Sequence, residues 1–193
     1  MNEYLEAFEA LFPSGSSGGF WGGPRDFDEE LGAYRARYPM CRKYAWAIPS
    51  DAAIATIAAL SPIVEIGAGG GYWAKLLREA GADIVAYDVA PYKNHWVEGR
   101  WSGVHNGGPQ MVGRHPDRTL LLCWPPMSEM AAEALKRYRG DTVAYIGEGA
   151  GGCTASDVFH ARLERSFDCA ETVAIPKWPG LHDYLTIWRR NDG

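Results

Sequence analysis

The chain has 193 residues, a formal net charge of −5, and contents of 47% hydrophobic and 22% charged residues. This length suits one globular domain, or one domain with a small appendage, and the composition is that of an ordinary globular protein. The acidic N-terminal sequence predicts no signal peptide, and no apolar run reaches the roughly 18 to 20 residues that span a bilayer. A cytoplasmic protein without a membrane partner is expected.

Composition also argues against two kinds of site. The negative net charge disfavours nucleic-acid binding, because electrostatic attraction dominates that binding. A basic stretch interleaved with tyrosines, from Tyr34 to Tyr44, fits either a base-stacking surface or a solvated helix face. The four cysteines form no CxxC pair and the five histidines lack metal-ligand spacing, so reduced thiols and no metal are expected.

Residues 1–60 are expected to form an N-terminal helical segment, with a possible role as a lid. Apolar residues recur at helical spacing between Tyr4 and Phe12, which predicts a short amphipathic helix. Residues 13–24, PSGSSGGFWGGP, predict a surface loop or a mobile lid. Further helices are expected over residues 27–47 and residues 51–60, the second with Ser50 as its N-cap.

From residue 61 onward, short apolar strands alternate with helices. Strands are expected at Ile63–Ile66, Ile84–Tyr87, Thr119–Cys123 and Thr142–Ile146, and helices at Tyr72–Glu79, Ser128–Tyr138 and Ser156–Phe167. Continuous apolar strands separated by helices predict a parallel sheet that is covered on both faces. The last two strands, CAETVAI and DYLTIWRR, are joined by a turn too short for a parallel crossover, so an antiparallel hairpin is expected.

The sequence IVEIGAGGG, residues 63–71, places a glycine-rich turn directly behind the first strand. Such a turn lets the backbone approach a nucleotide closely. Asp88 ends the next strand, 21 residues after Gly67, where a carboxylate can accept both hydroxyls of a ribose. The dinucleotide fingerprint GxGxxG needs glycine where Tyr72 stands, which argues against a nicotinamide-dependent dehydrogenase.

The pattern ExGxGxG from Glu65 to Gly71, followed by Asp88, resembles motif I and the next acidic position of the class I S-adenosylmethionine-dependent methyltransferases. The resemblance extends from Ile63 to the C-terminus and implies a methyltransferase domain over residues 61–193. It implies an α/β fold, a Rossmann-like three-layer αβα sandwich. Its seven-stranded, mostly parallel sheet has the order 3-2-1-4-5-7-6 and ends in an antiparallel hairpin. The implied cofactor is S-adenosylmethionine, with S-adenosylhomocysteine as product.

The resemblance also assigns cofactor contacts by position. The loop glycines approach the methionine and ribose portions, Glu65 holds the loop or reaches the amino group through water, and Asp88 takes the ribose hydroxyls. Asn106 is the candidate for contacting adenine. The implied cofactor-binding set is Glu65, Gly67, Ala68, Gly69, Gly71, Asp88, Val89, Asn106, Cys123 and Trp124.

The sequence CWPP, from Cys123 to Pro126, follows the strand Thr119–Cys123. It resembles the D/N-P-P-Y/F motif of amine methylases, but Trp124 replaces the acceptor residue and an indole only donates hydrogen bonds. That departure disfavours methylation of a base or glutamine amine. Trp124 is interpreted instead as stacking on a flat substrate, packing on the cofactor, or filling a core corner.

Residues near the expected reactive methyl are candidates for acceptor binding and catalysis. The substrate candidates are Tyr44, Trp46, Pro125, Pro126 and Cys153. Glu148 is a candidate general base, or a residue that holds its loop, and His95 is a candidate base or a surface histidine. The expected function is O- or N-methylation of a small molecule. The alternatives are methylation of protein or nucleic acid, and a non-catalytic cofactor-binding module.

Overall fold

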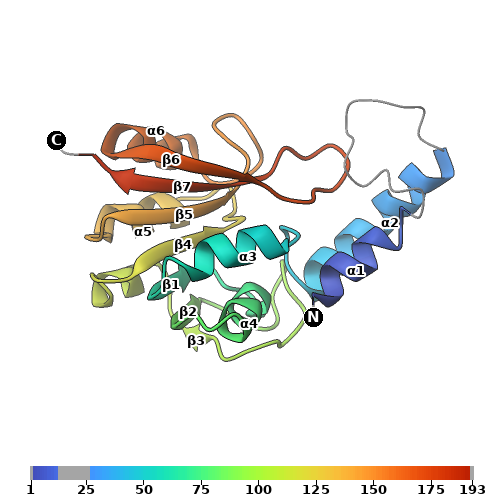
Figure 1. The fold of residues 1–193 in the computed structure, drawn as a ribbon, viewed down its shortest axis with the longest axis horizontal. Helices are drawn as coiled ribbons and strands as arrows, with labels where there is room; N and C mark the ends of the chain where they lie inside the picture. Colours follow the sequence, from blue (N-terminus) through green and yellow to red (C-terminus); the bar gives the residue numbers. More distant parts are fainter. Residues whose placement is uncertain (1, 13–26, 192–193) are drawn as a thin grey trace.

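The computed structural model describes residues 2–12 and 27–191 (Figure 1). The predicted loop at residues 13–24 lies outside the described residues. The helices are α1 (Glu3–Glu9), α2 (Phe27–Lys43), α3 (Asp51–Ala58), α4 (Tyr72–Glu79), the 3-10 helix η2 (Pro109–Arg114), α5 (Met130–Arg137) and α6 (Asp157–Ser166). The strands are β1 (Ile63–Ile66), β2 (Ile84–Asp88), β3 (His105–Asn106), β4 (Thr119–Cys123), β5 (Thr142–Gly147), β6 (Phe167–Ala174) and β7 (Tyr184–Arg190).

All seven strands form one sheet of order β3-β2-β1-β4-β5-β7-β6. Strands β3, β2, β1, β4 and β5 run parallel to one another, whereas β7 runs antiparallel to both β5 and β6. The expected fold class and the expected hairpin are therefore confirmed. The hairpin contains a register shift between Cys169 and Glu171 of β6.

Helices cover both faces of the sheet and bury a separate core on each side (Figure 1). On one face, Ile57 of α3 and Leu77 of α4 belong to a buried cluster with Leu121 of β4. On the other face, Leu135 of α5 belongs to a cluster with Leu122, the next residue of β4. Successive strand residues point to opposite faces, so an unbroken apolar strand supplies both cores.

Local signals set several helix ends where they were expected. The Ser50 hydroxyl accepts a hydrogen bond from the Ala53 amide at 3.2 Å and caps α3. Gly81 takes a positive φ of 88° just after α4, as a C-terminal stop does. The prediction for α2 was too long, because the helix ends at Lys43. The chain leaves the helical path at Tyr44, which is buried in the protein interior.

Helices α1 and α2 lie side by side at one end of the molecule, next to the turn between β6 and β7 (Figure 1). Tyr4 of α1 and Trp178 of the turn are buried in one cluster with Tyr72 of α4. The Trp178 indole donates to the Tyr4 hydroxyl at 2.9 Å, and the Tyr4 amide donates to the Tyr72 hydroxyl at 3.0 Å. The N-terminal helices are thus fixed where the strand-end loops gather.

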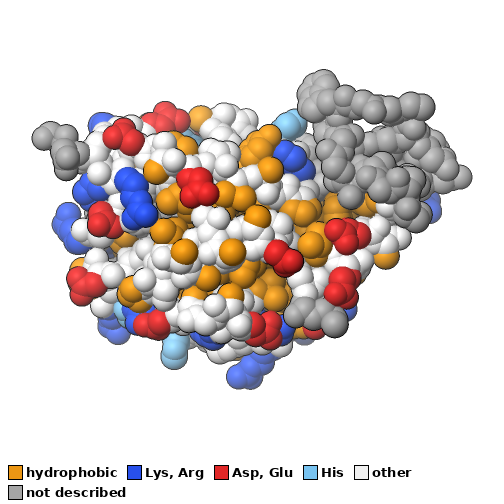
Figure 2. Space-filling model, in the orientation of Figure 1, with side chains coloured by type: hydrophobic (Ala, Val, Ile, Leu, Met, Phe, Trp, Pro, Cys, Tyr) orange, Lys and Arg blue, Asp and Glu red, His pale blue; other side chains and the backbone are white. Residues whose placement is uncertain are grey.

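The surface seen in Figure 2 carries basic and acidic side chains interspersed with one another. Within residues 2–12 and 27–191, no helix is both long enough and apolar enough to span a membrane.

Candidate functional site

A cavity of about 810 Å³ opens at the carboxyl ends of β1, β2 and β4. We call its two parts the glycine-loop half and the aromatic half. The glycine-loop half is lined by Glu65, Ile66, Gly67, Ala68, Gly69, Gly70, Asp88, Val89, Gly107, Gly108 and Pro109. The aromatic half is lined by Arg37, Cys41, Tyr44, Trp46, Asn94, Trp96, Trp124, Pro125, Pro126 and Cys153. Pockets for small ligands span about 300 to 1,000 Å³, so this volume is near the upper end.

The glycine loop between β1 and α4 follows a path that only glycine adopts easily. Gly67, Gly69 and Gly71 have φ values of 83°, 55° and 77°. A Cβ on Gly70 would lie 2.6 Å from the Gly99 carbonyl oxygen. The loop is therefore pressed against the connection between β2 and β3, and its backbone forms a floor of the cavity.

Asp88 at the end of β2 closes over this loop. Its side chain is largely buried, with 8% of the residue exposed. One carboxylate oxygen accepts a hydrogen bond from the Gly69 amide at 2.9 Å and the other from the Ala90 amide at 2.8 Å. Each oxygen keeps a further lone pair, so Asp88 holds the loop and still presents acceptors to the cavity.

Glu65 lies beneath the loop and is 2% exposed. Its Oε2 atom is buried and has no hydrogen-bond partner among the described residues. Burial raises the pKa of this carboxyl to about 8, and Asp88 nearby adds to the rise while Arg78 opposes it. An unpartnered buried carboxyl is costly, so this position favours a hydrogen-bond donor or a cation as its ligand.

Trp124 of the CWPP corner forms one wall of the aromatic half. Its backbone has a positive φ of 50°, and its ring stacks on Trp46 with a centroid distance of 5.0 Å and an interplanar angle of 24°. The indole nitrogen donates to Oδ1 of Asp183 at 2.9 Å. Asp183 is 1% exposed, and burial raises its pKa to about 6. The hydrogen bond to the buried Asp183 carboxyl group thus fixes the orientation of the indole.

A second wall comes from the connection between β2 and β3, which is tied to the end of α2. The Trp46 indole donates to the Trp96 carbonyl at 2.9 Å, and the Glu98 amide donates to the Arg42 carbonyl at 2.8 Å. Arg42 and Glu98 also form an ion pair at 3.1 Å. These contacts join segments about 50 residues apart in the sequence and form one side of the aromatic half, where Trp96 stays 47% exposed.

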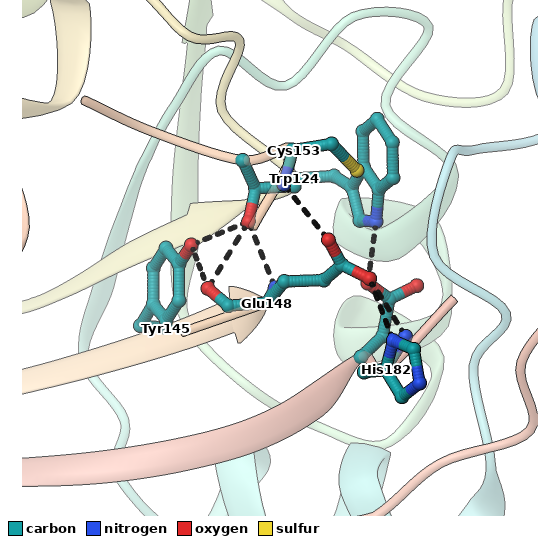
Figure 3. Close-up of polar contacts among 7 residues, drawn as sticks. Trp124, Tyr145, Glu148, Cys153 and His182 are labelled. Carbon is teal, nitrogen blue, oxygen red and sulfur yellow. Dashed lines mark hydrogen bonds and ion pairs between the residues drawn. The ribbon is translucent and has the colours of Figure 1, made fainter. Parts of the chain in front are cut away.

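Glu148 holds two loops together outside the cavity lining (Figure 3). Its two carboxylate oxygens accept from the Cys153 and His182 amides, both at 2.8 Å. Burial acts to raise the pKa of Glu148, and the hydrogen bonds from Cys153 and His182 outweigh it, so the pKa is lowered. His95 is exposed, packs its ring edge-on to Trp96, and is also absent from the lining. Their catalytic roles stay predictions.

Most of the other predicted site residues line the cavity, and two do not. Gly67, Ala68, Gly69, Val89, Cys123, Trp124, Tyr44, Trp46, Pro125, Pro126 and Cys153 line the cavity, together with Glu65 and Asp88. Gly71 shapes the loop without lining the cavity. Asn106 is exposed and donates to the Val89 carbonyl at 3.2 Å, while Gly107, Gly108 and Pro109 line the cavity beside it. Contacts of all these residues with a ligand stay predictions.

Sequence reasoning missed Arg37 and Cys41 of α2 as cavity residues. A signal was present: the buried residues Ala33, Cys41 and Tyr44 recur at helical spacing, and Arg37 falls on their face of the helix. For the metal prediction, no group of three His, Cys, Asp or Glu side chains suited to an ion occurs within the part of the chain that the structure describes.

No protein-family model matches the chain, and no curated protein matches its sequence. Several solved structures are similar to the fold of this chain. A TehB-like SAM-dependent methyltransferase from Corynebacterium glutamicum has a TM-score of 0.51 at 16% identity, over 86% of this chain and 100% of that one. Magnesium protoporphyrin IX methyltransferase from Synechocystis, solved with bound SAM, has a TM-score of 0.51 at 10% identity, over 99% and 98%.

The tRNA (uracil-54, C5)-methyltransferase of Pyrococcus abyssi, solved with S-adenosyl-L-homocysteine, has a TM-score of 0.48 at 13% identity. That match covers 70% of this chain and 36% of the archaeal one. The two closer likenesses span nearly the whole of their chains, and the sheet order agrees with the order expected from the glycine-loop resemblance. The chain therefore has the fold of the class I S-adenosylmethionine-dependent methyltransferases.

Proposed function

We propose that the chain is an S-adenosylmethionine-dependent methyltransferase that acts on the oxygen or nitrogen of a small molecule. One observation carries the proposal. A single cavity connects a glycine loop and Asp88, suited to a nucleoside, with a separate chamber walled by tryptophans. A ligand in the first half would face an acceptor in the second. The cytoplasm is the proposed location, which agrees with the four free cysteines.

The residues of the glycine-loop half fit this cofactor. Glu65 offers a buried carboxyl without a partner, which suits the cofactor's amino group. Asp88 offers acceptors for ribose hydroxyls, and the backbone from Gly67 to Gly70 allows close approach. Val89 and Gly107 lie farther along the cavity and leave an apolar edge for the base. When bound, S-adenosylmethionine supplies an activated methyl group on its sulfonium.

The contribution of the chain is positioning and exclusion of water. Among the described residues that line the cavity, Glu65 and Asp88 are the carboxyl groups, and both lie in the glycine-loop half. The aromatic half therefore presents no carboxylate or histidine base from the described residues. Methyl transfer there relies on holding the acceptor atom in line with the methyl group, between side chains that displace water from the acceptor. An acceptor that is already a good nucleophile suits such a site.

Helix α2 supplies Arg37 and Cys41 to the aromatic half, and the segment after it supplies Tyr44 and Trp46. We therefore assign acceptor recognition chiefly to the N-terminal 60 residues. A small acceptor is favoured over a large structured partner because α2, the β2–β3 connection and the CWPP corner bound one chamber of a cavity of about 810 Å³ that also has to hold the cofactor. The interspersed charges of the surface in Figure 2 offer no broad basic face to nucleic acid on that side.

Calorimetric titration with S-adenosylmethionine, S-adenosylhomocysteine and NADH tests the proposal. Micromolar binding of the two sulfur ligands and no binding of NADH is expected. Asp88→Ala is expected to weaken the sulfur ligands about tenfold to a hundredfold, since hydrogen bonds to a charged group contribute roughly 1.5 to 3 kcal/mol. The control, Asp117→Ala, removes an exposed carboxylate before β4, away from the cavity, and should bind like the wild type.

Two results would refute parts of the proposal. If neither sulfur ligand binds, the glycine loop is an ordinary turn and the methyltransferase assignment fails. If both bind but no methyl group is transferred when nucleophilic small molecules are supplied, the chain is a binding module without catalysis. Release of S-adenosylhomocysteine, followed by mass spectrometry, distinguishes turnover from binding alone.

A further inference from the structure

The aromatic half of the cavity has walls that suit a flat ring. Trp46 and Trp124 stack on each other, and Trp96 meets Trp46 edge-on at 5.5 Å between centroids. All three line the cavity. Aromatic rings stack on one another with centroids about 4.5 to 7 Å apart, which stabilises planar ligands beyond the burial of their area. A planar aromatic group is therefore the best-matched occupant.

Arg37 is the one cationic side chain among the described residues that line the cavity. It lies on the inner face of α2, four residues before the buried Cys41 and seven before the buried Tyr44. The neighbouring Arg42 is paired with Glu98, whereas none of the carboxylate side chains described in residues 2–12 and 31–191 forms an ion pair with Arg37. A half-buried guanidinium that faces a cavity favours an anionic ligand group.

Some other polar groups of this half are already engaged, whereas the Tyr44 hydroxyl and the Trp96 indole nitrogen have no hydrogen-bond partner among the described residues and can also donate to a ligand. The Asn94 side chain donates to the Ala90 carbonyl and accepts from the Trp96 and Val97 amides. The Cys41 thiol lies 3.7 Å from the Tyr4 hydroxyl, and burial raises its pKa to about 11, so it adds no charge. Arg37 lies beside the Cys41 thiol and its charge also acts on the buried Asp183 carboxyl, but it forms no ion pair with a described side chain, so its guanidinium keeps donors for a ligand. One positive charge matches a monoanion, whereas a phosphate usually gathers several donors.

We propose that the aromatic half binds a small aromatic monocarboxylate, with its ring on the Trp46–Trp124 pair and its carboxylate on Arg37. This inference rests on the proposed function, because it takes the bound acid to be the methyl acceptor. The acid binds through Arg37 and presents a ring hydroxyl or amino group to the glycine-loop half. The oxygen or nitrogen of that group would form a bond to the methyl carbon as the carbon–sulfur bond breaks, with S-adenosylhomocysteine as leaving group and the acceptor's proton released to water. A cationic amine is excluded by the charge of Arg37, although tryptophan faces alone would attract it.

The test compares three ligands that share one ring: 4-hydroxybenzoate, 4-hydroxybenzamide and 4-hydroxybenzylamine. Each is titrated into the full chain saturated with S-adenosylhomocysteine, and uridine 5′-monophosphate serves as the phosphate probe. The carboxylate is expected to bind about tenfold or more tightly than the amide, and the amine more weakly than the amide. A charge-assisted pair with arginine is the source of this difference.

Variants of α2 show whether Arg37 is responsible. Arg37→Gln is expected to weaken 4-hydroxybenzoate about tenfold to a hundredfold and leave 4-hydroxybenzamide unchanged. Arg37→Lys should keep part of the preference, because it keeps the charge but not the two-pronged geometry. The matched control is Arg35→Gln, which removes an exposed arginine two residues away, outside the cavity lining, and should leave every affinity unchanged.

Four results overturn the inference: equal binding of acid and amide, tighter binding of the amine or the nucleotide, an Arg37→Gln variant that keeps the preference, and no binding of any ring probe at millimolar concentration. These failures are separable from failure of the proposed function. If S-adenosylhomocysteine binds and the acid does not, only this inference fails. If S-adenosylhomocysteine does not bind, the same ring series is titrated into the chain alone. A preference for the acid that is lost in Arg37→Gln then supports the binding site, and no such preference overturns it.

Discussion

Replacing Glu65 by glutamine is expected to stabilise the chain at neutral pH. The Glu65 carboxyl has an ordinary pKa of 4.5, and burial raises it to about 8 in the folded state. Between these values the folded chain holds a proton that the unfolded chain has released, so stability falls as the pH rises through this window. The slope is about 1.4 kcal/mol per pH unit. Glutamine is a neutral isostere and removes this dependence.

Urea unfolding at pH 5 and pH 7 measures the effect. Over these two units the free energy of unfolding of the wild type should fall by about 3 kcal/mol relative to that of Glu65→Gln. Other groups that titrate in the same window, Asp183 among them, contribute equally to both proteins and cancel in the comparison. Glu164→Gln is the control, because Glu164 is an exposed carboxylate of α6 and its replacement should leave the pH profile parallel to the wild type.

The same variant should bind S-adenosylhomocysteine more weakly, because an ionised Glu65 is the expected partner of a ligand ammonium group. A higher free energy of unfolding together with weaker ligand binding is expected for a buried carboxyl that lacks a hydrogen-bond partner until the ligand binds. Parallel pH profiles for the wild type and Glu65→Gln would refute the reasoning. That result would mean that Glu65 is ionised in the folded chain and already has a partner.

Two further substitutions test the geometry of the site by urea unfolding. Trp124→Phe keeps a ring against Trp46 but removes the donor to the buried Asp183, so it should cost about 1 to 3 kcal/mol. The same change at Trp188, whose indole donates to a hydroxyl on the same strand, should cost less, and equal losses would contradict the assigned role of Asp183. Gly71→Ala places a methyl group 2.6 Å from a side-chain oxygen at a φ of 77°, whereas Gly81→Ala at a φ of 88° meets open space. Both should lose about 1 to 2 kcal/mol from the strained φ, with a further loss only at Gly71.

Much of the fold is readable from local sequence. The strands from β1 to β5 that were predicted lie within a residue of their observed ends, because each is a short apolar run bounded by glycine, proline or polar residues. The antiparallel hairpin follows from the length of its turn. The two-residue strand β3 had no such signal, since His105 and Asn106 carry no apolar pattern, and pairing with β2 alone defines it.

The sequence by itself determined four parallel strands, the closing hairpin, the glycine loop and Asp88, because these depend on periodicity, on glycine conformations and on spacing within one unit of the chain, whereas the strand order was implied by the family resemblance. Only the tertiary structure decided what surrounds the loop. It placed Arg37 in the cavity, set Asp183 behind Trp124, and used Glu148 to hold two loops. The contacts of Asp183 with Trp124 and of Glu148 with His182 join residues 59 and 34 positions apart. Residue type and local spacing carry no information about which distant segment a side chain meets, because packing of the whole chain selects the partner.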